Sequence, residues 1–280
     1  MSYNNFIPTI WSDKIQTDRD RNCVAISLCN RDFEGAIANV GDTVKINGVL
    51  RPTVAQYIKG STVISPENLG DQSTNMTIDK SDYFAFLIDN IDKQQAQGNI
   101  MSAQMQQAAQ ALAESADSYI YGKYADAGST IDCTGITSAN VLSKIMAAFG
   151  YLWDNNVPSN ASISIEASSG LMQKILLAKL VHGMPNDTIL QNGLQGSIAG
   201  LLGSKVFLTN GIYNDGTFDY CFVRTTSAIG FADQIAETKA YNPESSFSDA
   251  VKGLHLYGGK VLRPKELAVL KCSYTAETTI

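Results

Sequence analysis

The clearest alternation of apolar and polar positions runs from residue 92 to residue 124. Apolar side chains recur there at steps of three and four residues, at Met101, Met105, Ala108, Leu112, Ala116 and Tyr119/Ile120. That spacing predicts one amphipathic helix, about 45 Å long at 1.5 Å per residue. A compact domain of this mass does not need so long a helix.

The same helix carries no charged residue between Gln94 and Ala113, where seven residues are glutamine. A helix that faces solvent normally has charged residues on its outer face. We expect the neutral face to pack against neighbouring subunits, and solvation by the amide side chains is the alternative. Gln106→Glu together with Gln110→Glu is then expected to hinder assembly while the subunit stays folded, because buried unpaired charge is costly.

The N-terminal third is expected to have little core of its own. Residues 1–40 are irregular and rich in polar positions, which predicts an extended arm. Residues 41–91 alternate as strands, and Asn47-Gly48 is a hairpin-turn signal. The pattern predicts a long two-stranded excursion. Such ribbons are marginal in water by themselves, so this one is expected to lie on another surface.

Helices alternate with strands between residues 137 and 235, which predicts an α/β subdomain. The expected helices cover 137–155 and 169–180, and the first has Val141, Ile145, Ala148/Phe149 and Leu152 on its inner face. Strands are expected at 161–167, 205–208 and 220–224, the last two joined by a hairpin turn at 214–217, with loops at 125–140 and 193–203.

The chain returns to strands over residues 251–274. Gly258-Gly259 and residues 263–266 are expected to be turns. The last strand, from residue 267 to residue 272, is expected to pair near the long helix. The overall fold class is therefore predicted as α+β.

Composition narrows the function. The 280 residues are 44% hydrophobic but only 17% charged, with a net charge of −6. This combination excludes disorder and indicates wide contact with other protein, since interface cores are poor in charge. The acidic balance speaks against a protein that mainly grips phosphate. With no signal peptide and no apolar run near ~18 residues, no membrane partner is expected.

Candidate chemistry is sparse. The chain has no P-loop, dinucleotide, zinc-protease or serine-hydrolase motif. The glycines near residues 193–203 lack the lysine and hydroxyl of a phosphate loop. His182 is expected at a helix end and His255 as a packed strand residue. Reduced core thiols are expected at Cys23, Cys29, Cys133, Cys221 and Cys272.

The paired carboxylates also have structural explanations. Asp92, close to Asp89, is expected to cap the long helix, and Asp79 and Asp82 are expected to flank a turn. We therefore expect no catalytic, cofactor-binding or metal-binding residue, no cofactor and no enzyme activity.

The order of these parts resembles the major capsid proteins of tailed bacteriophages, which have the Hong-Kong-97-like fold. The resemblance covers nearly the whole chain. It rests on Asn30-Arg31-Asp32-Phe33-Glu34-Gly35 with Gly41-Asp42-Thr43-Val44-Lys45-Ile46, on Asp79, Tyr83-Phe84 and Asp89-Asn90-Ile91-Asp92-Lys93, and on Ala228-Ile229-Gly230-Phe231-Ala232-Asp233-Gln234-Ile235 and Val261-Leu262-Arg263-Pro264.

The resemblance implies four parts: an N-terminal arm (1–40), an extended loop (41–91), a peripheral domain with a spine helix (92–136 and 251–280) and an axial domain (137–250). It also implies a structural protein that self-assembles as pentamers and hexamers. These would form the icosahedral head around double-stranded DNA. Its location would be the virion, with assembly in the host cytoplasm.

The implied partners are other copies of the chain, a portal and a decoration protein, with packaged DNA close by without specific contacts. A separate scaffolding protein is expected because the arm has no charged helical extension. Some relatives cross-link a lysine to an asparagine. Lys45 and Lys59 lie in the extended loop, but no motif identifies the asparagine and glutamate, so this chemistry is not carried over. The alternatives are an encapsulin-like compartment shell and a soluble α/β enzyme in 137–250.

Overall fold

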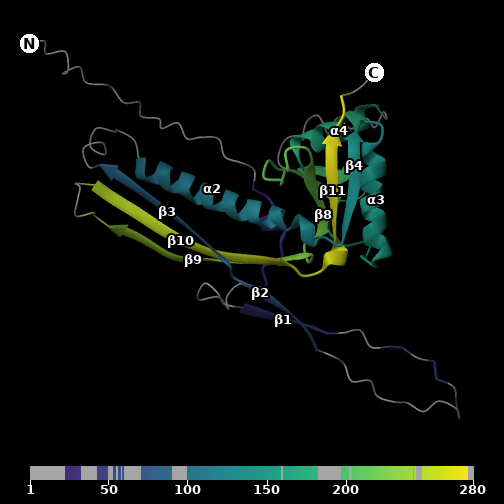
Figure 1. Cartoon of the computed structure of the whole chain (residues 1–280), viewed down its shortest axis with the longest axis horizontal. Coiled ribbons are helices and arrows are strands. Elements are labelled where there is room, and N and C mark those ends of the chain that lie inside the picture. Colours follow the sequence, from purple (N-terminus) through teal and green to yellow (C-terminus); the bar gives the residue numbers. More distant parts are fainter. Residues whose placement is uncertain are drawn as a thin grey trace, which may run out of the picture.

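A computed structural model describes residues 23–32, 43–49, 53–54, 56–57, 59, 71–89, 100–158, 160–181, 197–201, 204–241, 243 and 248–276. Figure 1 shows a long helix beside a narrow sheet and, at one end, a block of helices on a wider sheet. Helices and strands are mixed along the chain, so the α+β class is confirmed.

The helices are α2 (Ile100–Tyr121), α3 (Val141–Asp154) and α4 (Ser169–Val181), with 3-10 turns η1 (Ile26–Leu28), η2 (Gly122–Asp126) and η3 (Pro264–Glu266). The strands are β1 (Thr43–Val49), β2 (Asp71–Thr77), β3 (Lys80–Asp89), β4 (Ser129–Ile136), β5 (Ile163–Ala167), β6 (Ser197–Leu201), β7 (Ser204–Leu208), β8 (Asp219–Thr225), β9 (Ile229–Tyr241), β10 (Ser248–Val261) and β11 (Leu267–Tyr274).

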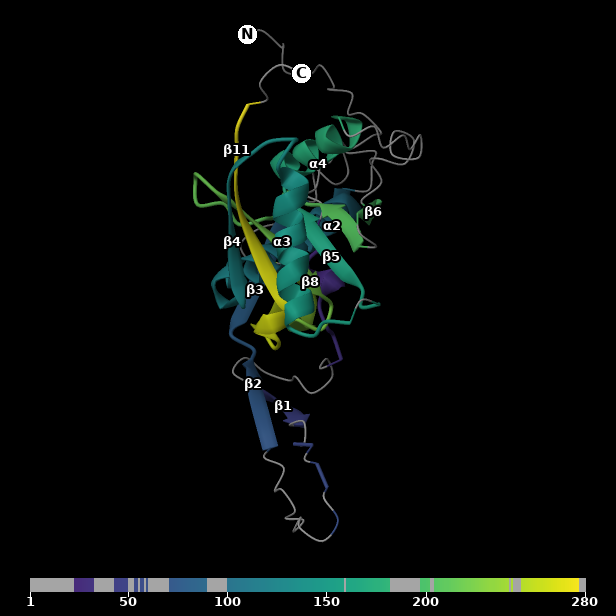
Figure 2. The same ribbon diagram turned by 90° about the vertical axis from the view of Figure 1, so that its right-hand side faces the viewer.

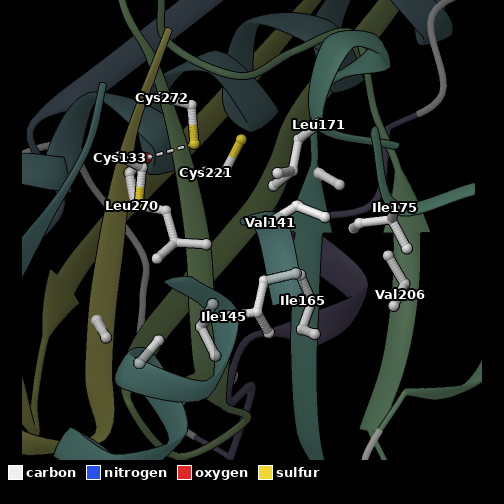
Figure 3. Packing of buried hydrophobic residues seen from close by; sticks show 14 of the residues in the cluster. Cys133, Val141, Ile145, Ile165, Leu171, Ile175, Val206, Cys221, Leu270 and Cys272 are labelled. Carbon is white, nitrogen blue, oxygen red and sulfur yellow. Dashed lines mark hydrogen bonds between the residues drawn. The ribbon is translucent and has the colours of Figure 1, made fainter. Parts of the chain in front are cut away.

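A six-stranded sheet in the order β4-β11-β8-β5-β7-β6 forms the wider block. Helices α3 and α4 pack on one of its faces, and Figure 3 shows the core between them. The predicted inner face of α3 is confirmed, since Val141, Ile145, Ala148, Phe149 and Leu152 are all buried. The helix begins at Val141 with Asn140 as its N-cap, later than predicted.

A second core lies between the opposite face of this sheet and the narrow part of the molecule. The C-terminal end of α2 contributes Ala116, Ile120 and Tyr121, which pack with Phe222 of β8 and Phe231 of β9. The narrow part itself is the three-stranded sheet β3-β10-β9, and α2 lies along it (Figure 1).

The two-stranded excursion is confirmed only for β1 and β2, because the rest of its predicted return strand is β3, which belongs to the narrow sheet. β1 and β2 pair antiparallel, Thr43 opposite Thr77, and Figure 2 shows the pair projecting below the body. Among the described residues of this ribbon, the packed apolar side chains lie at the root, where Met76 and Ile78 join Ala232 and Leu256 in a small third cluster. Asn47-Gly48 lies inside β1, so the hairpin turn predicted there is wrong.

One further predicted turn lies inside a continuous strand, and two predicted loops each contain a strand. β10 runs through Gly258-Gly259 without a turn. A Cβ at Gly258 would lie 2.5 Å from the carbonyl oxygen of Thr77, so a larger residue would not fit there. Glycine there allows close approach to the ribbon root rather than a turn. The expected loop 125–140 contains β4, and the expected glycine loop contains β6.

One predicted strand pairing is confirmed and one is wrong. β11 pairs with β4 and β8 in the six-stranded sheet, and its Leu267 and Val269 pack with Ala116, Ile120 and Tyr121 of α2, so it lies near the long helix as predicted. Its residues Leu267–Leu270 are buried, because both faces of this strand are covered. β7 and β8 are not hairpin partners, since β5 lies between them. These pairings depend on distant segments and leave no local sequence signal.

Candidate functional site: the arm root and the surfaces around it

Residues 23–32, named here the arm root, join the N-terminal arm to the body. Within them, the backbone N–H groups at the start of η1 point at α2. Asp117 Oδ1 accepts hydrogen bonds from Ala25 N at 2.7 Å and Ile26 N at 3.4 Å. A carboxylate placed at exposed turn N–H groups supplies acceptors that the turn itself lacks, so α2 holds the start of the arm root.

Arg224 of β8 holds the other end of the same turn. Its guanidinium donates to Ala25 O at 3.0 Å, to Leu28 O at 3.1 Å and to Glu166 Oε1 at 2.5 Å. The side chains of Arg224 and Glu166 are fully buried. A guanidinium has five N–H donors in a fixed fork, which lets this one side chain pair a buried carboxylate and tie down two backbone carbonyls.

This cluster holds two carboxyl groups and one guanidinium group. Asp117, Glu166 and Arg224 are all buried. Burial, with the negative charge of Glu166 adding to it, raises the pKa of Asp117 to about 6. Burial disfavours the charge on Arg224, but Glu166 outweighs it and raises the pKa of Arg224. Burial also raises the pKa of the Cys29 thiol. Asp117 therefore takes up a proton at a higher pH than an ordinary carboxyl group does.

The arm root then runs onto β9. Asn30 N donates to Ile229 O and Phe231 N donates to Asn30 O, each at 2.9 Å. Arg31 pairs with Asp233 at 2.7 Å, and Asp233 also lies 3.2 Å from His255 Nε2. His255 is buried within β10, which confirms it as a packed strand residue. The arm root thus links α2, β8 and β9.

The predicted carboxylate sites fasten the narrow sheet to α2. Asp79 lies in the β2–β3 connection and accepts from Tyr119 Oη at 2.8 Å. Asp82 accepts from Ser115 at 2.5 Å and from Tyr257 at 2.6 Å, and these hydrogen bonds lower its pKa. Asp82 lies inside β3 rather than beside a turn, so that prediction is wrong.

Some candidate residues are not brought into this site. Lys45 lies in β1 and Lys59 in a turn, both exposed. Cys133, Cys221 and Cys272 are buried together in the sheet core (Figure 3). His182, Asp92, Gly193 and the side chain of Asp89 lie outside the described residues.

The exposed positions of α2 between residues 103 and 118 are all uncharged: Gln104, Gln106, Ala109, Ala111, Ser115 and Ser118. Gln110 is different, because its Nε2 donates to Cys23 Sγ at 3.5 Å. Because Gln110 contacts the arm root of its own chain, a substitution there does not test whether the outward face of α2 is an interface. Gln106 is exposed, so a substitution at Gln106 does test it. That α2 packs against neighbours stays a prediction.

Sequence patterns missed the Asp117–Glu166–Arg224 cluster. The available signal was one charged residue within a run of mostly hydrophobic and small residues in each of two strands, Glu166 in β5 and Arg224 in β8. Charged residues are almost never fully buried unless paired. Opposite charges in two such strands therefore indicate a pair, but their neighbouring places in the sheet come only from the fold.

Two searches concern the described residues alone. Across those ranges no three His, Cys, Asp or Glu side chains are grouped so that they could hold a metal ion. Of the helices in the same ranges, none combines the length and the apolar character needed to cross a membrane.

No protein-family model and no curated protein sequence matches the chain. Solved structures do. The structure titled Mycobacterium phage Che8 is 28% identical, with a TM-score of 0.78 over 96% of this chain and 98% of that one. The capsid of cyanophage P-SCSP1u is 14% identical, with a TM-score of 0.73 over 97% and 94%. The capsid of Ralstonia phage GP4 is 9% identical, with a TM-score of 0.73 over 100% and 99%.

Along nearly its whole length the chain therefore has the fold of solved phage capsid proteins. The resemblance in fold to phage capsid proteins, predicted from the sequence, is thereby confirmed.

Proposed function

We propose that the chain is the coat protein of a tailed phage with the Hong-Kong-97-like fold, assembling as pentamers and hexamers into an icosahedral head around double-stranded DNA. The observation that carries the proposal is the β1–β2 ribbon. It projects from a body of capsid fold, and among its described residues the packed apolar side chains lie at the root, with Met76 and Ile78. Because two-stranded ribbons are marginal alone, a neighbouring subunit is the natural support.

Other surfaces support the same proposal. The outward positions of α2 are uncharged, as expected of a surface buried in an interface. On the narrow sheet, Tyr83 is 77% exposed and Leu87 is 55% exposed. Large apolar side chains exposed close together commonly mark contact sites. Neighbouring subunits would cover both surfaces in a shell.

The four-part division remains part of the proposal: arm 1–40, extended loop 41–91, peripheral domain 92–136 and 251–280, axial domain 137–250. Sheet membership supports moving two of its edges. β4 and β11 share the six-stranded sheet with β5, β7 and β8, and β9 shares the narrow sheet with β3 and β10. We assign β4 and β11 to the axial domain and β9 to the peripheral domain.

A separate scaffolding protein, a portal and a decoration protein are proposed partners, with assembly in the host cytoplasm. The net charge of −6 suits a container that does not bind its DNA tightly, since phosphate attraction needs clustered Lys and Arg. Uniform closed shells formed by the coat protein expressed alone would argue against an obligatory scaffold.

The compartment and enzyme alternatives are not favoured, because the solved structures above include phage capsids and the fold is accounted for over nearly the full chain. Sedimentation followed by negative-stain electron microscopy tests the proposal. Closed shells, or rings of five and six subunits, are expected. A homogeneous monomer or dimer at every salt and protein concentration, with scaffold co-expressed, would contradict it. Shells that carry an enzyme instead of DNA would favour the compartment.

A further inference from the structure

An apolar groove lies between α2 and the narrow sheet. It is open to solvent and has a volume of about 270 Å³, with Met105, Ala109 and Ala113 on the helix side, Phe84 and Leu254 on the sheet side and Ile26 of the arm root at its wall. The polar residues Asp233, Thr238 and His255 also line it, but most of the lining is apolar. The two alanines, four residues apart on one helix face, leave the hollow that larger side chains would fill. An apolar cavity of roughly 150 Å³ already accommodates a benzene ring, so this one has room for a larger aromatic side chain.

The N-terminal arm starts beside this groove. Cys23 Sγ accepts a hydrogen bond from Gln110, next to Ala109 on α2, at 3.5 Å. Ile26, three residues later, lines the groove. The hydrogen bonds of Asp117 and Arg224 hold the backbone between them. The chain that precedes Cys23 therefore leaves the body next to the groove.

That preceding chain carries the apolar side chains that the groove lacks. Residues 1–22 contain Phe6, Ile7, Ile10, Trp11 and Ile15. The groove side of α2 from Ala113 to Met105 is about 12 Å long. Trp11 and Cys23 are twelve positions apart, and an extended chain over twelve positions reaches about 40 Å.

We propose that residues 6–15 occupy this groove on their own chain, with Trp11 as the anchor. The tether from Cys23 keeps the local concentration of this segment high, so modest contacts suffice to hold it. The docked segment would cover part of the uncharged surface of α2 in the free subunit. The proposal does not depend on shell formation.

The chain provides a simple probe, because Trp11 and Trp153 are its only tryptophans. Trp153 lies on α3 and is 43% exposed. The full-length Trp153→Phe variant leaves Trp11 as the sole indole. In dilute dissociated subunits we expect blue-shifted emission and acrylamide quenching several-fold weaker than for free N-acetyltryptophanamide. Emission and quenching equal to those of the free compound would overturn the proposal.

A pair of matched variants locates the contact. Ala109 and Ala111 are both exposed. Ala109 lines the groove, so Ala109→Phe fills it, whereas Ala111 does not line it and lies about 200° further around the same helix. In the Trp153→Phe background, Ala109→Phe is expected to raise the quenching of Trp11 toward the free value, and Ala111→Phe is expected to leave it unchanged. Equal quenching in both variants would place Trp11 elsewhere and overturn the assignment.

Dilution distinguishes docking of the segment on its own chain from docking on a second copy of the chain. Protection of Trp11 that persists unchanged down to monomer concentrations supports docking on the same chain, and protection lost on dilution shows a second copy and overturns it. If Ala109→Phe fails to fold, Trp11→Ala tests the groove by a second measurement, the binding of a hydrophobic dye. It should raise binding of the hydrophobic dye ANS several-fold over the Trp153→Phe control. Equal binding would count against the groove as the site.

Discussion

The two halves of helix α2 show how differently this chain treats two of its regions. Its end, with Ala116, Ile120 and Tyr121, is buried against the wide sheet. None of its residues between 103 and 113 is buried, and in the described part of the β1–β2 ribbon the packed apolar side chains lie at the root. The wide sheet has a core on both faces. One region is therefore stable through contacts within the chain, while the other leaves surfaces that we propose neighbouring subunits cover.

The largest effect is expected from removing the charge that holds the arm root to the wide sheet. Arg224→Met leaves Glu166 buried without its partner and should lower the free energy of unfolding by roughly 3–5 kcal/mol. Urea denaturation measures it. The exposed pair Arg263–Glu266 is the control, and Arg263→Met should cost less than about 1 kcal/mol.

A double variant sharpens this test. Glu166→Leu combined with Arg224→Met removes both charges, and it should recover part of the loss because replacing a buried ion pair by apolar residues is often tolerated. If Arg224→Met costs no more than Arg263→Met, the arm root is not held as described.

The next largest expected effect is a change in the free energy of unfolding with pH. Because Asp117 has a pKa of about 6 in the folded chain against 3.8 ordinarily, the folded state binds its proton more tightly between those values. Stability relative to Asp117→Asn should therefore rise as pH falls from 7 to 4, by up to roughly 2–3 kcal/mol. Paired denaturation curves over this range measure the difference, in which other titrating groups cancel. A flat difference would show that Asp117 is not perturbed by burial.

The hold of the ribbon on the body is tested by two glycines. Gly258→Ala places a Cβ 2.5 Å from Thr77 O and should cost roughly 1–3 kcal/mol while displacing the ribbon root. Gly150 in α3 has no atom within 4 Å of its Cβ position, so Gly150→Ala should raise stability by up to about 1 kcal/mol. Thermal unfolding compares them. A harmless Gly258→Ala would remove the packing explanation for the continuous strand.

The smallest effect on the subunit is expected on the outward face of α2. Gln104→Glu with Gln106→Glu should change subunit stability by less than roughly 0.5 kcal/mol yet reduce particle yield, because assembly would bury unpaired charge. Gln173→Glu, at an exposed position of α4, controls for added charge. Normal yield from the double variant, measured by sedimentation, would remove the interface argument.

Patterns within one segment predicted more than patterns between segments. The inner face of α3 was predicted residue by residue, because helical spacing is local. The position of β11 between β4 and β8, and of β5 between β7 and β8, depends on which distant strands meet. Gly258 was predicted to lie in a turn, because glycine is common both in turns and where another backbone approaches a strand closely. The Asp117–Glu166–Arg224 cluster needed the fold before its members met.

Hydrogen exchange of free subunits and assembled particles, followed peptide by peptide, tests the central claim most directly. We expect β5, β8 and β11 to be protected in both states, since their core lies within the chain. Amides of β1 and β2 should exchange quickly in free subunits and slow down by at least tenfold in particles. Equal exchange of the ribbon in the two states would contradict the claim that its support comes from neighbouring subunits.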